Sequence, residues 1–142
     1  MKITELRIGN LVLFDGEILP VCSLHDDNTL RLLKNGKSIG CFSIEAVMPI
    51  PITPEILEKS GFTKGEVNIM SSYMNPKGEK EPCYWNGNGF VLIRPEQNTF
   101  VGRKYLGDQL QDTFFSTVIF YVHQLQNYFP AFNEGRELEI KL

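Results

Sequence analysis

Two histidines and three cysteines are the side chains of this 142-residue sequence best suited to act as bases, nucleophiles or metal ligands. His25 and His123 lie far apart, and no cysteine pair has the C-x2-C spacing of a metal site. Cys22 and Cys41 stand among apolar neighbours, where a free cysteine behaves as a small buried hydrophobe. We expect reduced thiols, no metal and no cofactor.

Catalytic signatures are missing from the sequence. It has no G-x-S-x-G elbow, no Cys-His signature and no phosphate loop, and Asn86-Gly87-Asn88-Gly89 is a turn that supplies only part of a dinucleotide fingerprint. Paired carboxylates occur in polar or terminal segments, where solvation explains them: Asp26-Asp27, Glu79 with Glu81, and Glu137 with Glu139. We assign no catalytic residue and predict a protein that is not an enzyme.

His123 is the most informative polar residue, because Gln124, Gln126 and Asn127 follow it beside the apolar seam of a predicted helix. Such a row can bind a ligand carbonyl or a partner backbone, or it can hydrogen-bond a loop of its own chain. The internal bonds are favoured, since half-buried polar groups must find partners. His123, Gln124 and Asn127 are candidate binding residues.

Aromatic residues supply a second candidate surface. Tyr84 and Trp85 are adjacent, with Tyr73 and Tyr105 in the same region. They can form a binding surface for a peptide, a sugar or a base, although aromatics in a meander are commonly part of the core. Tyr84 and Trp85 complete the set of candidate binding residues.

The charge balance argues against nucleic acid as the first partner. The chain has 14 Lys+Arg and 17 Asp+Glu, a net charge of -3, and neither half carries an excess of one sign. Nucleic-acid binders usually gather basic residues on one face. The one modest cluster, Arg31, Lys34 and Lys37, lies close to Asp26-Asp27 and is favoured as a solvated hairpin. Nucleic-acid binding through this hairpin is the alternative function.

Residues 1–50 have the pattern of short strands joined by tight turns. Asp15-Gly16 and Asn35-Gly36 predict two-residue hairpins between apolar flanks. The predicted strands cover residues 6–14, 18–24, 29–33 and 38–44. Such spacing is typical of a small sandwich or partly open barrel. We predict a small SH3-like barrel unit.

A proline-rich connector, residues 48–54, leads into a short helix. Thr53 is the expected N-cap, with Pro54 in the first turn. Gly61 is expected to end the helix, with Phe62 folding back onto it.

Residues 63–105 predict an antiparallel meander with a polar loop at 75–82. Apolar residues then recur at helical spacing, which favours one long C-terminal helix over 115–129: Phe115, Val118, Val122, Leu125, Phe129 and Phe132. The alternative makes Thr113–Ile119 a strand and starts the helix near Phe120. Pro130 should end or kink the helix, and the alternating tail 136–142 can close a sheet edge.

Three stretches resemble a family of short, uncharacterised proteins of gut anaerobes, often associated with prophages or mobile elements. They are Leu6-Arg7-Ile8-Gly9-Asn10, the Pro49–Leu57 segment, and Tyr121-Val122-His123-Gln124-Leu125-Gln126-Asn127. After the third stretch the family usually continues Leu-Tyr-Phe-Ala-Leu, whereas this chain has Tyr128-Phe129-Pro130-Ala131-Phe132. The resemblance implies membership, but no activity, ligand or site residue.

Together these observations predict an α+β protein with a barrel-like unit at 1–50 and a helix, meander and C-terminal helix at 51–142. No apolar run is long enough to span a membrane, and the start lacks a signal-peptide pattern. We expect a cytoplasmic binding or accessory module that contacts an unidentified protein partner, or a second copy of itself, and no membrane.

Overall fold

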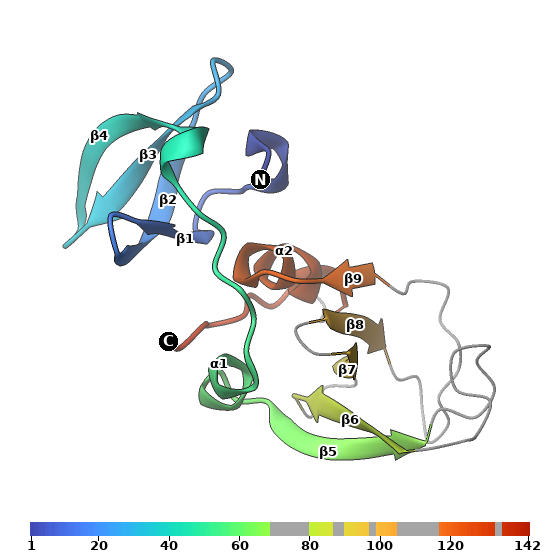
Figure 1. Ribbon diagram of the computed structural model, residues 1–142. Coiled ribbons are helices and arrows are strands. Elements are labelled where there is room, and N and C mark those ends of the chain that lie inside the picture. The colour runs from blue at the N-terminus through green and yellow to red at the C-terminus, as the bar shows by residue number, and fades with distance from the viewer. Residues whose placement is uncertain (69–79, 87–89, 97–98, 105–116, 133–134) are drawn as a thin grey trace. The chain divides into compact units, whose positions relative to one another are not determined.

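The computed structural model describes residues 1–68, 80–86, 90–96, 99–104, 117–132 and 135–142 (Figure 1). The elements are η1 (Ile3–Glu5), β1 (Leu11–Phe14), β2 (Glu17–Leu24), β3 (Thr29–Lys34), β4 (Lys37–Ser43), η2 (Ile44–Ala46), α1 (Pro54–Lys59), β5 (Thr63–Asn68), β6 (Lys80–Trp85), β7 (Phe90–Glu96), β8 (Thr99–Lys104), β9 (Thr117–Ile119) and α2 (Val122–Phe132). The η elements are 3-10 turns. The predicted α+β class with antiparallel sheets and a C-terminal helix is confirmed.

The chain forms two compact units. The N-terminal unit contains Met1–Pro51 and Tyr121–Tyr128, and the C-terminal unit contains Ile52–Phe120 and Phe129–Leu142. The N-terminal unit is therefore assembled from two segments of the chain. That residues 1–50 and 51–142 form separate domains remains a prediction.

The N-terminal sheet has the order β1-β2-β3-β4, with all neighbours antiparallel. Asp15 and Gly16 have φ of 49° and 77°, and Asn35 and Gly36 have φ of 51° and 75°. Two consecutive positive φ angles are the signature of a type I′ hairpin, whose twist matches that of the strands. Both predicted hairpins are confirmed.

After η2 the chain returns to β1. Leu13 and Met48 exchange two backbone hydrogen bonds, of 2.9 and 2.8 Å. Irregular register within the β2-β3 and β3-β4 pairs lets the sheet bend. The enclosed core consists of apolar side chains from every strand except β4 and from both flanking segments: Leu6, Val12, Leu19, Val21, Leu30, Leu32 and Val47. Ile39 and Phe42 of β4 pack against this core.

The short helix α1 is fixed by its caps, as predicted. The Thr53 hydroxyl accepts a hydrogen bond from the Ile56 amide at 3.2 Å, and Pro54 opens the helix. Gly61 has φ of 89°, its amide bonds the Glu58 carbonyl, and the Phe62 amide bonds the Leu57 carbonyl. This pair of bonds is the Schellman motif.

Replacing Gly61 with alanine is expected to lower the free energy of unfolding by about 1 kcal/mol, because an L-residue is strained at positive φ. A Cβ at this position would meet no atom within 4 Å, so the loss arises from the backbone alone. Urea denaturation measures the change. Gly61→Asn is the matched control and should lose less, because asparagine tolerates this conformation. Equal losses in the two variants would contradict the explanation.

The C-terminal unit contains the predicted meander, a sheet of order β5-β6-β7-β8-β9. Its core face carries Tyr84, Leu92, Phe100 and Ile119, all buried, and the Tyr84 and Phe100 rings meet edge-on with centroids 6.0 Å apart. Cross-strand alternation places these four residues on one face.

Part of the predicted 75–82 loop is strand instead. Residues 80–82 pair with β5, and Pro82 is tolerated because that part of β6 has no register partner in β7. The predicted turn at 86–89 lies mostly outside the described residues, as do residues 75–79.

The prediction of one long helix from Phe115 is wrong. Thr117–Ile119 forms β9 and pairs with β8, and the helix begins at Val122. The run Thr-Val-Ile is β-branched, which favours the strand that the alternative reading proposed. Phe115 lies outside the described residues.

The C-terminal end also differs from expectation. Pro130 lies inside α2, which continues to Phe132. Proline has no amide hydrogen to bond the Gln126 carbonyl, so the helix passes Pro130 with one bond fewer and ends two residues later. The tail 136–142 forms no strand, and its Lys141 amide bonds the Ser60 hydroxyl at 3.0 Å. Within the described ranges, no helix has the length and apolar character needed to cross a membrane.

Candidate functional site

Asn127, on the second turn of α2, joins the helix to the N-terminal segment. Its side-chain nitrogen donates to the Glu5 carbonyl at 2.7 Å. Its side-chain oxygen accepts from the Asn10 amide group at 3.0 Å. Both ends of the Asn127 amide are thus occupied by residues of the same unit.

Gln126 makes a parallel pair of bonds. Its side-chain oxygen accepts from the Leu11 backbone amide at 2.9 Å, and its nitrogen donates to the Gly9 carbonyl at 3.3 Å. We call Asn10, Gln126 and Asn127 the amide network. Its bonds are the internal ones that the sequence favoured for the polar row of α2.

Asn10 is the centre of the amide network and is only 3% exposed. Its side-chain oxygen accepts from the Arg7 amide at 2.8 Å, and its backbone amide bonds the Arg7 carbonyl at 3.1 Å. Gly9, with φ of 90°, allows the tight turn between them. The amide network therefore fixes the turn at residues 7–10, with Ile8 exposed at its tip.

The connector meets the start of α2 in the same unit. The Val122 amide bonds the Ile50 carbonyl at 2.9 Å, and Pro51 forms a β-bridge with Tyr121. Residues 6–10, 49–51 and 121–127, from the three stretches that carry the family resemblance, are thus brought together in the N-terminal unit.

His123 is completely buried. Its ring stacks on that of Tyr121, with centroids 5.8 Å apart and planes 9° apart. Glu5 Oε2 lies 3.9 Å from Nε2, and neither ring nitrogen has a hydrogen-bond partner among the described residues. Burial lowers the pKa of His123 below its ordinary value, opposed by the Glu5 carboxylate and reinforced by the chain's amino group.

The remaining candidate binding residues have different environments. The Gln124 side-chain oxygen accepts from the Tyr121 amide at 3.2 Å and so caps the first turn of α2. Tyr84 is buried in the core of the C-terminal unit, whereas the adjacent Trp85 is 48% exposed. Trp85 is therefore the most accessible of the five predicted binding residues.

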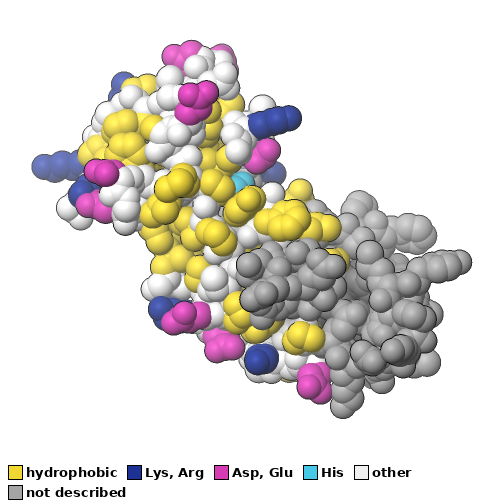
Figure 2. Space-filling view, viewed as in Figure 1, with side chains coloured by type: hydrophobic (Ala, Val, Ile, Leu, Met, Phe, Trp, Pro, Cys, Tyr) yellow, Lys and Arg dark blue, Asp and Glu magenta, His cyan; other side chains and the backbone are white. Residues whose placement is uncertain are grey.

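The basic hairpin does not present one cationic face. Lys34 forms an ion pair with Glu17, with Nζ 2.6 Å from Oε2. Lys34 and Lys37 are cross-strand partners, but Arg31, three residues earlier on β3, faces the opposite side of the strand. Basic and acidic side chains are interspersed on the visible surface (Figure 2). Because the basic side chains do not gather on one face, these observations favour protein binding over nucleic-acid binding.

The sequence analysis did not predict a contact between Ser23 and His25. Ser23 Oγ lies 3.0 Å from His25 Nε2 on the exposed β2–β3 hairpin. The sequence signal for this contact was the spacing of two residues, which places both side chains on the same face of an extended chain. Asp27 is bonded to the Thr29 hydroxyl at 2.6 Å, and this bond lowers the pKa of Asp27. No described contact orients the second nitrogen of His25 through a carboxylate, so the contact lacks the geometry of a triad.

The cysteines are free thiols. Cys41 is exposed on β4, where its thiol donates to the Thr29 hydroxyl, so its expected burial is wrong. The cause is that β4 is an edge strand and exposes most of its length. Cys22 is half-buried. Cys83 is buried, and its own burial raises the pKa of its thiol. Across the described part of the chain, no group of three potential ligands is placed to hold a metal ion.

Comparison with known proteins finds no matching family model, no matching curated protein and no matching solved structure.

Proposed function

We propose that the protein is a non-enzymatic binding module that acts through protein contacts, by the outer face of its C-terminal sheet. This face lies opposite the core residues Tyr84 and Phe100. Trp85, 48% exposed, and Val118, 46% exposed, both lie on it. Two large exposed apolar side chains on one sheet face are the observation that carries the proposal.

Strand register defines the outer face. Cys83 pairs with Ile93, Ile93 with Val101 and Val101 with Val118, so these positions form one row across four strands. Trp85 follows two residues after Cys83 and therefore shares its face. Cys83 itself is buried, so the exposed apolar surface of this face lies at Trp85 and Val118.

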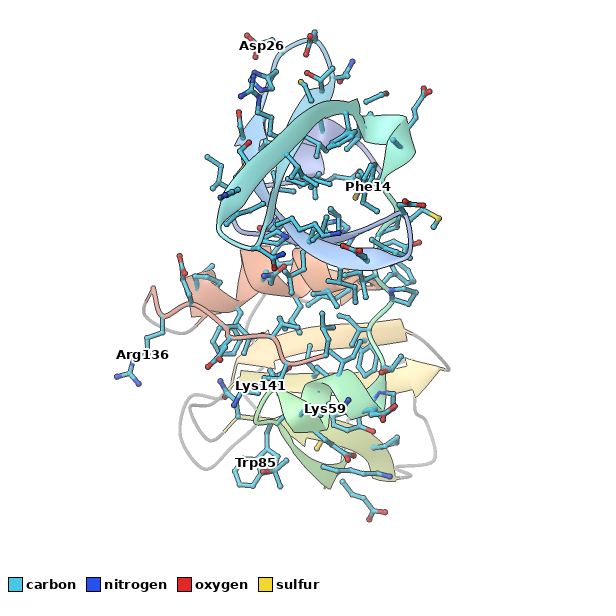
Figure 3. The ribbon with its side chains drawn as sticks, turned by 90° about the vertical axis from the view of Figure 1, so that its left-hand side faces the viewer. Phe14, Asp26, Lys59, Trp85, Arg136 and Lys141 are labelled. Carbon is cyan, nitrogen blue, oxygen red and sulfur yellow. The ribbon has the colours of Figure 1, made fainter. Side chains whose placement is uncertain are left out.

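The indole ring of Trp85 lies beside Gly65 of β5. A Cβ on Gly65 would lie 3.8 Å from Trp85 Nε1 and 3.6 Å from the Cys83 sulfur. The ring therefore lies close to the β5 backbone while its outer part stays in solvent (Figure 3). A tryptophan with one supported side and one exposed side is typical of an interface anchor. A partner with an apolar surface fits this face.

Trp85 is the single tryptophan of the chain, so its fluorescence reports binding at this face directly. Peptides selected from a displayed random library on the intact protein should shift the Trp85 emission to shorter wavelength as the indole is buried. Val118→Ser keeps the fluorophore and should weaken this binding by about tenfold or more, the cost of losing an apolar interface contact.

Two results would contradict the proposal. One is selected peptides that bind the Val118→Ser and Trp85→Ser variants as tightly as the wild-type chain. The other is duplex DNA that binds with strong salt dependence while peptides do not, which would favour the basic hairpin. Light scattering over a concentration series tests whether a second copy of the chain is the partner, and Val118→Ser should then abolish dimer formation.

We further propose that the N-terminal unit is an SH3-like barrel. Phe14 of β1 and Phe42 of β4 have ring centroids 4.3 Å apart, although two strands separate them in the sheet. Their contact supports a sheet curled upon itself, with Phe14 turned inward (Figure 3), and the Met48 bridge adds a further strand position beside β1. SH3-like modules commonly bind peptides, an analogy of fold that agrees with protein binding. An association with prophages remains a prediction.

A further inference from the structure

The imidazole of His123 is buried without the hydrogen bonds that a buried polar ring normally has. Both ring nitrogens are shielded from solvent, and no described donor or acceptor lies within hydrogen-bond distance of either. Buried polar groups of this kind are rare, and each needs a physical explanation. A neutral imidazole leaves one N–H unsatisfied, whereas an imidazolium would leave two and add a buried charge.

The contacts around His123 couple its protonation to one structural joint. His123 lies in the first turn of α2, and this turn contains no acidic residue. Tyr121 stacks on one face of the ring. The charged groups that act on it are the Glu5 carboxylate of η1, 3.9 Å away, and the amino group of Met1. Asn127 holds the backbone of Glu5 against the same helix.

We propose that His123 makes the joint between α2 and the N-terminal segment sensitive to protons, so that protonation releases residues 1–10 from the helix. The ring is buried, so an imidazolium gains contact with water only when η1 moves away. The Asn127 bond to Glu5 and the turn at residues 7–10 then loosen together. At neutral pH the uncharged ring keeps the joint closed.

The sign of the pH dependence follows from the lowered pKa of the buried ring. The unfolded chain takes up the proton at about pH 6.5 and the folded chain only at lower pH. The contribution of His123 to stability is therefore complete above pH 6.5 and declines as the pH falls toward the lowered pKa. In that window the folding equilibrium constant should fall by up to about tenfold per pH unit.

Proton NMR of the intact wild-type chain tests the joint without any substitution. The His123 ring protons should titrate with a midpoint below pH 6.5, and the Asn127 side-chain amide signals should change with the same midpoint. Glu5→Gln should move the His123 midpoint further down, because it removes the charge that favours the imidazolium. A His123 midpoint at or above pH 6.5, or Asn127 side-chain signals that do not change as His123 titrates, would overturn the proposal.

Denaturation between pH 5 and 8 supplies an independent test. His123→Leu should lose the fall in stability below pH 6.5, and His25→Leu, the matched control, should keep it. A wild-type chain that becomes more stable in acid would show instead that Glu5 pairs with the imidazolium and strengthens the joint. That result also contradicts the proposal.

Discussion

Replacing Phe100 with alanine is expected to lower the free energy of unfolding by about 3–5 kcal/mol. Phe100 is completely buried on the core face of the meander and meets the ring of Tyr84 edge-on. Its β8 position pairs with Ile119 of the neighbouring strand, which is also fully buried. Truncation therefore removes a large apolar surface and leaves a cavity between three strands that the backbone pairing holds in place.

Urea denaturation measures this loss. Val118→Ala, on the outer face of the same sheet, is the matched control and should change stability by less than about 1 kcal/mol, because Val118 is nearly half exposed. Similar losses at both positions would mean that the outer face is packed as tightly as the core, and would remove the basis for the proposed binding surface.

Asn10→Ala should have the second largest effect, a loss of about 2–4 kcal/mol. The substitution deprives the Arg7 amide and the Asn127 side-chain oxygen of their hydrogen-bond partners in a site where Asn10 itself is 3% exposed. Each buried polar group left without a partner costs about 1–3 kcal/mol.

A double-mutant cycle that combines Asn10→Ala with Asn127→Ala measures the coupling energy between the two side chains, apart from the effect of each substitution alone. Because Asn10 and Asn127 share a direct hydrogen bond, their effects should be non-additive by about 0.5–3 kcal/mol. Additive losses would show that the two side chains stabilise the unit independently, and the amide network would not be one cooperative feature.

The features that the sequence predicted correctly depend on neighbouring residues. Asp15-Gly16, Asn35-Gly36 and the caps of α1 each act within a few positions, and glycine or asparagine chemistry determines their backbone angles. The Thr117–Ile119 segment failed because its apolar spacing satisfies a helix while its β-branched residues favour a strand. Pairing with β8 decides between these patterns, and periodicity contains no information about that partner.

The site was predicted only in part, for a related reason. The sequence favoured internal hydrogen bonds for the polar row of α2. Gln124 and Asn127 make such bonds, whereas neither ring nitrogen of His123 has a hydrogen-bond partner among the described residues. The sequence analysis gave Asn10 and Glu5 no role. Their contacts with α2 join residues 117 and 122 positions apart, a distance over which no local rule operates. Trp85 and Tyr84 are adjacent and look alike in sequence, and only alternation across the strand separates the exposed residue from the buried one.

The separation between Asn10 and Asn127 has a consequence during synthesis. At ribosomal rates of about 5–20 residues per second, the 117 intervening positions take roughly 6–23 s to translate. β1–β4 are complete once Ser43 has been added, and for the 84 positions that remain before Asn127 the side chain of Asn10 has no helix to bond. Until α2 is made, the polar groups that it later bonds stay hydrated, so a segment translated late completes the N-terminal unit.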